Sequence, residues 1–334
     1  MSKASIKDIA LLLGVSKTTV SWVLSGQSQH RKISDETRDR VLEAAKSLHF
    51  EPNYFAKGLY SGRSQTIGLL VPDVENPFFA RMARIIESEA EKQQYSVMYC
   101  SSEEDSVKED RLIRMLYSKK VDGMIIAPTN HAEETLEHLH RNNVPFILVD
   151  RDLERISAPF VGTDNLSGTR ELIAHMLSKG CRKIGVICSV PDISSVRLRL
   201  EGYRASLKMA GIEPNEQLIV DVGYGDSACI RQGVDTLLSR GVDAIFFTAN
   251  SIAIPGLKRL KDLKINIPGQ VSVGSFDDMD LMSLHEPAIT AVEQPVDDIA
   301  RMAVELLIRR INAKGETHAS EKVMLPAKLH TRDS

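Results

Sequence analysis

The first twenty-five residues carry apolar side chains at the spacing of two short helices. The first of these helices has one apolar face, made by Ile6, Ile9, Ala10 and Leu13. Ser5 and Asp8 stand at the two positions of a capping box, and Gly14 can adopt the positive φ of a tight turn. Ser16 is a ready N-cap for a second helix, whose inner stripe is Val20, Val23 and Leu24. Two short helices that cross over a glycine turn predict a helix-turn-helix.

A third helix and a linker follow this pair. Ser34 caps the third helix, and its predicted apolar face is Val41, Leu42, Ala45 and Leu48. Residues 1–50 are therefore expected to form a three-helix headpiece. In the linker, residues 51–65, Pro52 can start a helix of only about two turns, and so short a helix is marginal in water. We expect a hinge helix here that forms only when another molecule holds it.

From Thr66 onward, short apolar runs alternate with amphipathic stretches. The runs predict strands at 67–71, 95–100, 124–127, 146–149, 183–188, 218–222, 244–248 and 271–275. The stretches predict helices at 78–93, 106–119, 132–141, 166–179, 197–210, 227–239 and 252–263. This alternation is typical of an α/β fold with doubly wound parallel sheets. We expect a two-lobed body over 66–334 with a cleft between the lobes: lobe one at about 66–162 and lobe two at about 163–289. A tail of about 290–330, with elements at 289–293, 295–311 and 322–329, is expected to complete lobe one.

Composition is that of a soluble globular protein, with 43% hydrophobic and 26% charged residues. The net charge of −3 hides an asymmetry, because residues 1–63 hold ten Lys and Arg against six Asp and Glu. A basic head on an acidic body suits contact with phosphate. No stretch resembles a signal core or a membrane span, so a cytoplasmic protein is expected. The four cysteines lack paired metal-ligand spacing and are expected to be reduced structural thiols.

The motifs together resemble the lactose repressor family of bacterial transcription regulators. The segments that carry this resemblance are "IKDIALLLGVSKTTVSWVLSG", "PNYFAKGL" before "SQTIGLLVPDVENPFF", "VDRD", "RLRLEGY", "SFDD" and "VEQP". The arrangement "SKTTVSWVLSG" followed by "HRKISDETRDRV" looks closest to the fructose repressor branch. The resemblance covers nearly the whole chain and implies a periplasmic-binding-protein-like body. It also implies a repressor that responds to a sugar or sugar phosphate bound between its lobes.

In the headpiece, the resemblance implies that the bound DNA sequence is selected by Lys17, Thr18 and Trp22. Lys17 can donate to guanine, and Thr18 can bond a base or place its methyl on thymine. Phosphate contacts are expected from Ser16, Thr19, Ser21 and Asn53. By resemblance, Leu59, with Ala56 one turn earlier, enters the minor groove and kinks the duplex. The alternatives are a core role for Trp22 and packing of Leu59 on the body.

At the ligand end, a polyol needs carboxylates, amides, a guanidinium group and an aromatic face. The resemblance carries these roles to Asn76, Phe78, Asp150, Arg199, Tyr224, Asn250, Asp277 and Gln294. Asp150 or Asn250 alone could equally be a turn or cap residue. Ser251 departs from the family pattern, which often has an aspartate there, and Tyr224 rests on a loose match. Arg81, Arg151 and Arg197 would suit an acidic or phosphorylated sugar, or could form ordinary ion pairs.

Two further function classes compete with a regulator. An enzyme acting in the cleft lacks support, because the sequence shows no nucleophile elbow, no P-loop and no GxGxxG motif after the first strand. A ligand-independent architectural DNA-binding protein would show no response to sugars. We expect no metal or cofactor, and His131, His138 and His140 are interpreted as surface residues. The partners expected are a pseudo-palindromic DNA operator and a second copy of the chain. We expect a dimer rather than a tetramer because no leucine heptad follows residue 311.

Overall fold

The computed structural model describes residues 4–24, 28, 31–50, 63–129, 131–153, 155–190, 192–224, 226–313 and 321–334. The chain divides into two compact units, with the boundary along the sequence between Gln65 and Thr66. The expected hinge helix, with Asn53, Ala56 and Leu59, lies outside the described residues. In the described part of the chain, no helix has the length and apolar character that crossing a membrane requires.

The headpiece is a helix-turn-helix with a third helix, as predicted. Its elements are α1 (Ile6–Leu13), α2 (Lys17–Leu24) and α3 (Asp35–Ser47). Ser5 and Asp8 form the capping box, with the Ser5 amide donating to the Asp8 carboxylate at 2.8 Å. Gly14 ends α1 in the left-handed region, at φ 67°. The Thr19 amide donates to Ser16 Oγ at 2.9 Å, which caps α2.

The headpiece core is centred on Ile9, Val20 and Val41, which are fully buried. One predicted core position is wrong: the Leu42 side chain is 47% exposed, and Ala44 is buried instead. The inward stripe of α3 is therefore 41, 44, 45 and 48, which keeps the i, i+3, i+4, i+7 spacing of a helix face. Leu42 lies about 100° around the helix from Val41 and so points away from the core.

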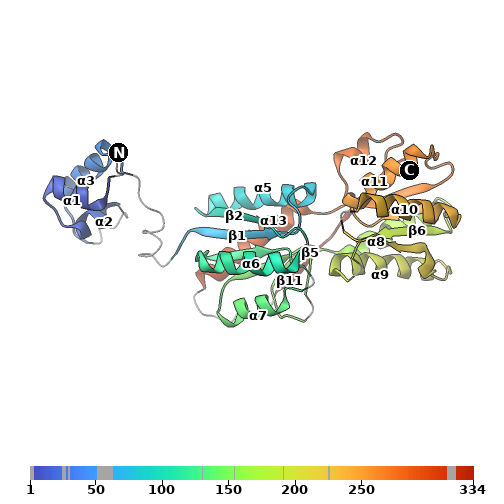
Figure 1. Ribbon diagram of the computed structural model, residues 1–334, viewed down its shortest axis with the longest axis horizontal. Coiled ribbons are helices and arrows are strands. Elements are labelled where there is room, and N and C mark those ends of the chain that lie inside the picture. Colours follow the sequence, from blue (N-terminus) through green and yellow to red (C-terminus); the bar gives the residue numbers. More distant parts are fainter. Residues whose placement is uncertain are drawn as a thin grey trace. The chain divides into compact units, whose positions relative to one another are not determined.

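The body contains two six-stranded sheets with helices on both faces (Figure 1). The first sheet has the order β11-β5-β4-β3-β1-β2 and is parallel throughout. Its strands are β1 (Thr66–Val71), β2 (Ser96–Ser101), β3 (Gly123–Ile126), β4 (Phe146–Val149), β5 (Phe160–Thr163) and β11 (Lys322–Leu325). The second sheet has the order β12-β10-β9-β8-β6-β7, and only its β10–β12 pair is antiparallel. Its strands are β6 (Ile184–Cys188), β7 (Ile219–Asp221), β8 (Ala244–Phe247), β9 (Ser272–Phe276), β10 (Thr290–Glu293) and β12 (Lys328–His330).

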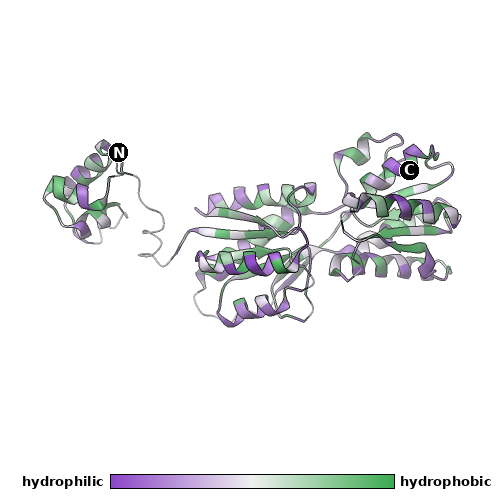
Figure 2. Ribbon diagram, viewed as in Figure 1, coloured by the Kyte–Doolittle hydropathy of each residue, from purple (hydrophilic) through white to green (hydrophobic). Residues whose placement is uncertain are grey.

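Each sheet separates two apolar layers, which Figure 2 shows as hydrophobic strands between amphipathic helices. In the first lobe, Leu69 packs with α5 (Pro77–Lys92) and α13 (Val296–Asn312), and Leu70 packs with α6 (Ser106–Ser118) and α7 (Glu133–Arg141). In the second lobe, Ile187 packs with α10 (Ser227–Ser239) and α11 (Asn250–Asp262), and Cys188 with α8 (Asn165–Ser178) and α9 (Ser194–Met209). Successive strand residues thus serve opposite layers.

The C-terminal tail is shared between the lobes, which corrects the prediction that all of it completes lobe one. The helix α13 and the strand β11 do belong to lobe one. In contrast, β10 pairs with β9, and β12 pairs with β10, so both strands belong to lobe two. An apolar run identifies a strand but not the sheet edge that accepts it, which is why the sequence did not assign these strands.

Three shorter elements were not predicted. These are β5, a 3₁₀ helix at Glu216–Leu218, and α12 (Asp280–Leu284). The strand β5 lies where we expected only the crossing between lobes near residue 162. The chain passes between the lobes after β5, after β10 and after β11 in the described part of the body.

Candidate DNA interface and ligand site

The outer face of α2 presents the side chains predicted to select base sequence. Lys17 and Thr18 are exposed, while Val20 and Val23 on the same helix are buried in the headpiece core. Trp22 is half-buried and is not part of that core cluster. The Arg31 guanidinium carbon lies 4.9 Å from the Trp22 ring centroid, so a cation covers this aromatic face. The structure thus favours the outward placement of Trp22 over a core role.

Asp277 is the centre of the candidate ligand site. It follows β9 in the left-handed region, at φ 69°, and its side chain is nearly buried. Its Oδ2 accepts the Asn250 backbone amide at 3.1 Å, and its Oδ1 accepts from Gln294 Nε2 at 2.6 Å. Thr163 Oγ1 then donates to Gln294 Oε1 at 2.6 Å. Three strand ends therefore meet at this carboxylate, as expected for a ligand site in an open α/β sheet.

A side-chain bond joins this centre to the first lobe. Asn250 Nδ2 donates to Asn76 Oδ1 at 3.1 Å, and the same Asn76 oxygen caps α5 by accepting the Phe78 amide at 3.0 Å. The second oxygen in this pair, Asn250 Oδ1, is buried without a hydrogen-bond partner. The site thus contains a buried acceptor that lacks a donor, at the junction of the two lobes.

Arg199 is buried on α9 beside the same carboxylate. Its Nε donates to Asn165 Oδ1 at 2.7 Å, its Nη1 donates to the Thr248 carbonyl at 2.6 Å, and its Nη2 lies 3.9 Å from Asp277 Oδ1. The guanidinium carbon stacks 3.7 Å from the Phe276 ring centroid. Burial lowers the pKa of Arg199, against the opposing charge of Asp277. Its guanidinium is therefore held in place by protein groups.

Asp150 and Arg151 form a second buried group at the end of β4. Asp150 is at φ 63°, and its carboxylate lies 3.7 Å from Arg151 Nε. Burial raises the pKa of Asp150 to about 6, although the arginines oppose this shift. Arg151 forms a two-pronged ion pair with Glu104, at 2.5 and 2.8 Å. The positive charge of Arg151 is therefore already balanced by Glu104.

Tyr224 and Phe78 complete the predicted set. The Tyr224 hydroxyl donates to Asp73 Oδ2 at 3.2 Å, a bond between lobe two and lobe one. Burial raises the pKa of Tyr224, with a further contribution from the Glu104 charge. Phe78 is largely buried in the first-lobe core, where its ring packs edge-on against Phe79 with centroids 4.9 Å apart.

A cavity of about 450 Å³ opens beside these residues. Four of the eight predicted ligand residues line it, namely Phe78, Asn250, Asp277 and Gln294. Asn76 and Arg199 do not line it but contact residues that do. Asp150 and Tyr224 do not line the cavity and lie in the Arg151–Glu104 group. The structure therefore brings six predicted residues into one network and places two in an adjacent one.

The remaining candidate arginines form ion pairs. Arg81 Nη2 lies 2.7 Å from Asp297 Oδ1, and Arg197 Nη1 lies 3.1 Å from Glu201 Oε1. Arg81 lines the cavity. Among the described residues, no group of His, Cys, Asp and Glu has the arrangement of a metal site.

The prediction missed several residues that hold the site, above all Asn165, Thr163, Thr248 and Glu104. Thr163 and Asn165 lie at the carboxyl end of β5, where the sheet rule places ligand residues. No expected strand places them at a sheet edge, because β5 itself was not predicted. No signal in the sequence pairs Glu104 with Arg151, which is 47 residues away.

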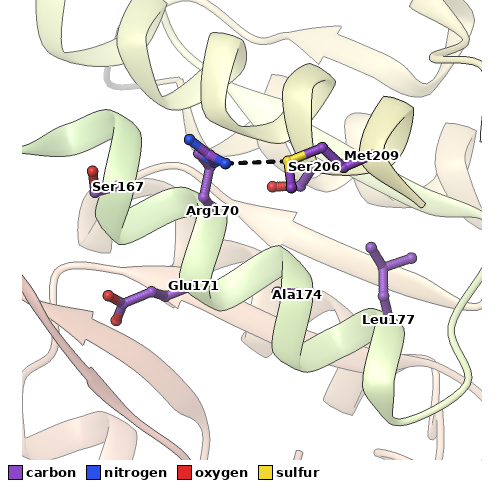
Figure 3. A pocket seen from close by; sticks show the side chains of 7 residues that line it. All are labelled: Ser167, Arg170, Glu171, Ala174, Leu177, Ser206 and Met209. Carbon is purple, nitrogen blue, oxygen red and sulfur yellow. Dashed lines mark hydrogen bonds between the residues drawn. The ribbon is translucent and has the colours of Figure 1, made fainter. Parts of the chain in front are cut away.

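A second hollow, of about 350 Å³, lies along α8 and α9 (Figure 3). Its lining is mostly apolar, and Arg170 Nη2 reaches the Met209 sulfur at 3.1 Å across it. None of the predicted ligand residues lines this hollow. The hydrogen-bonding groups that a polyol requires converge on the first cavity instead.

Comparisons with known proteins agree with this architecture. Residues 5–53 match the model for bacterial regulatory proteins of the lacI family, and residues 173–334 match the periplasmic binding protein-like domain. The ribose operon repressor of Halalkalibacterium halodurans is 30% identical, over 99% of this chain and 96% of its own length. The chain belongs to the LacI family of bacterial transcription regulators.

Solved structures of other LacI-type proteins support the same fold. The complex of the transcriptional regulator CelR with cellobiose matches with a TM-score of 0.74 and 26% identity, over 99% of both chains. A periplasmic binding protein/LacI transcriptional regulator from Alkaliphilus metalliredigens, in complex with D-xylulofuranose, matches with a TM-score of 0.70 and 26% identity. That match covers 80% of this chain and 98% of the other. The resemblance found in the sequence and the predicted fold class are confirmed.

Proposed function

We propose that this LacI-family protein is a sugar-responsive repressor that acts as a homodimer in the cytoplasm. Two headpieces would grip a pseudo-palindromic operator, with the recognition helix of each in the major groove. Lys17, Thr18 and Trp22 would contact bases, while Ser16, Thr19, Ser21 and Asn53 would contact phosphates. Leu59, with Ala56, would enter the minor groove from the hinge. The relatives being transcription regulators, we assign no enzymatic activity to the cleft.

The observation that best supports a ligand-controlled regulator is the bond between Asn76 and Asn250. It joins the two lobes inside a polar network beside a cavity of about 450 Å³, a size suited to a small molecule. A ligand that binds there with different affinity in two lobe arrangements would shift the equilibrium between them. The arrangement of the lobes would set the spacing of the two hinge segments, and so the affinity for the operator.

The proposed effector is a sugar. CelR was solved with cellobiose and the Alkaliphilus protein with D-xylulofuranose, both in the fold that this chain shares. The carboxylate, amide and guanidinium groups gathered around Asp277 are those that accept from and donate to sugar hydroxyls. The eight residues predicted from the sequence, Asn76, Phe78, Asp150, Arg199, Tyr224, Asn250, Asp277 and Gln294, are proposed to bind it directly or to hold the groups that do.

The test selects duplex DNA from a random pool with the full-length protein and measures binding with and without individual sugars. We expect a site with two symmetric half-sites, and we expect one of D-ribose, D-xylulose, D-fructose or cellobiose to change its affinity. The Lys17→Ala variant serves as the control for specific binding. If DNA binding is specific but no sugar changes either the affinity or the melting temperature, the protein is a ligand-independent DNA-binding protein and the proposal is wrong.

A further inference from the structure

The charges around the cavity define the class of effector more narrowly than "sugar", an inference that rests on the proposed function. Three arginines next to the site have carboxylate partners. Arg151 pairs with Glu104 at 2.5 Å, and Arg199 lies 3.9 Å from Asp277. Arg81, the arginine of the cavity wall, pairs with Asp297 at 2.7 Å. Each positive charge is thus balanced by a carboxylate of the protein.

The cavity wall itself is acidic. Besides Arg81, its charged residues are the four carboxylates Asp277, Asp278, Asp280 and Glu293. A phosphate or carboxylate ligand would have to lie beside these groups while displacing Arg81 from Asp297. Buried anions need a paired cation or several hydrogen-bond donors, and like charges close together are unfavourable.

The acidic wall does not make the site a cation site, because its innermost carboxylates already have partners. Asp277 accepts from Gln294 and from the Asn250 amide. Asp278 accepts from Arg332 through two bonds, at 2.7 and 2.8 Å. The inner wall is therefore balanced in charge while remaining rich in hydrogen-bonding groups.

One unpartnered oxygen shows what the site still requires. Asn250 Oδ1, on a residue that lines the cavity, is buried without a hydrogen-bond partner. A neutral acceptor of this kind is satisfied by an O–H donor. A phosphate group placed against this oxygen would offer acceptors in place of donors.

From the balanced arginines, the acidic wall and the unpartnered Asn250 oxygen, we infer that the effector is an uncharged polyol, an unphosphorylated sugar without a carboxylate or amine. The structure thus separates the two chemistries that the sequence left open, a sugar and a sugar phosphate. Asn250 Oδ1 accepts a hydrogen bond from one of its hydroxyl groups.

Matched sets of ligands test this inference with the full-length protein. The sets are D-ribose with ribose 5-phosphate, D-fructose with fructose 1-phosphate, and D-glucose with glucose 6-phosphate, gluconate and glucosamine. Dissociation constants are measured by calorimetry, and melting temperatures are measured alongside. We expect a neutral sugar to bind and to raise the melting temperature, with the charged members of its set bound at least about tenfold more weakly, or about 1.4 kcal/mol.

The salt dependence of binding supplies a second measurement. Because screening weakens only interactions between charges, the affinity of a neutral sugar should stay within about twofold between about 0.05 and 0.5 M NaCl. A charged member that binds as tightly as its neutral parent, or more tightly, overturns this inference while leaving the proposed function intact. If no member of any set binds, and D-xylulose and cellobiose do not bind either, the proposed sugar response itself fails.

Discussion

The Asn250 side-chain amide donates to Asn76 Oδ1 at 3.1 Å, and this bond joins the two lobes at the edge of the cavity. The Asn250 backbone amide is bonded to Asp277 in the same structure. One residue thus contacts the N-cap of a first-lobe helix and the central carboxylate of the second lobe. A ligand bound by this residue would act on both lobes at once.

Replacing Asn250 by alanine should therefore weaken effector binding. The Asn250→Ala change removes the amide but keeps the backbone bond to Asp277, so the fold should persist. Loss of a buried hydrogen-bonding group costs about 1–3 kcal/mol, so we expect about a tenfold or greater rise in the Kd of the effector. Calorimetry would measure it. The control is Asn266→Ala, which lies away from the cavity wall and should leave the Kd unchanged; an equal effect in both variants would contradict the assignment.

Gly202 allows α8 and α9 to pack closely. A Cβ at this position would lie 2.7 Å from the Leu166 carbonyl oxygen and 2.9 Å from Thr169 Cβ. Because the first of these atoms belongs to the backbone, Gly202→Ala should separate the helices at a cost of about 1–3 kcal/mol in the free energy of unfolding. Urea unfolding monitored by circular dichroism would measure this.

Gly233→Ala is the matched control for that change. The Cβ at Gly233 would meet side-chain atoms only, the nearest being Val222 Cγ1 at 3.1 Å. These side chains can adjust, and alanine also has the higher helix propensity. We expect a smaller loss of stability than at Gly202, and the reverse order would refute this account of the α8–α9 contact.

The buried carboxyl of Asp150 should make stability depend on pH. Burial raises the pKa of this group from 3.8 to about 6, so the folded state favours the protonated form. The protonated Asp150 carboxyl makes its full contribution to the free energy of unfolding below about pH 4. This contribution is lost as the pH rises through about 6. Asp150→Asn, which is neutral at every pH, should be more stable than the wild type above pH 6, by up to about 3 kcal/mol.

The measurement is the difference in free energy of unfolding between these two proteins from about pH 4 to pH 8. We expect the difference to shrink as the pH falls. A difference that stays constant over this range would show that Asp150 does not titrate there. Asp122→Asn, a change outside both polar networks, corrects for the general pH dependence of the fold.

The single tryptophan of the chain should report DNA binding. Trp22 lies on the outer side of α2 beneath the Arg31 guanidinium. Operator DNA should displace this cation or cover the indole, and so change the emission spectrum of the full-length protein. Binding should weaken with salt. For each phosphate contacted, the logarithm of the association constant should fall by about 0.9 for every tenfold increase in salt concentration. An unchanged spectrum at saturating operator would count against Trp22 at the groove, and Arg31→Ala should alter the emission without DNA.

The helices and most strands could be predicted because their signals are local. The capping pair of Ser5 and Asp8, the turn at Gly14 and the period of the apolar residues all lie within a few positions of each other. The roles of Asp277 and Gln294 came from the family resemblance rather than from any pattern. Their bond depends on a crossing of the chain that no local signal describes.

Distant pairings explain what the sequence did not show. β12 reaches its place in the second sheet only after α13 and β11 have returned to the first. Arg332 pairs with Asp278 across 54 residues, and Arg151 with Glu104 across 47. Without the positions of Glu104 and Asp297, the sequence alone leaves Arg151 and Arg81 as candidates for binding an anionic sugar. Charge balance in a site is a property of the folded chain, and only the partners reveal it.

The chain passes from one lobe to the other after Thr163, after Glu293 and after Leu325, within the part of the body that the structure describes. Three crossings of the chain restrict the separation of the lobes and favour rotation of one lobe relative to the other. One crossing contains Gln294. This side chain is hydrogen-bonded to Thr163, at the start of another crossing, and to Asp277. A metabolite bound at Asp277 would therefore lie beside these crossings. A small displacement there would move the distant ends of the lobes by a larger distance.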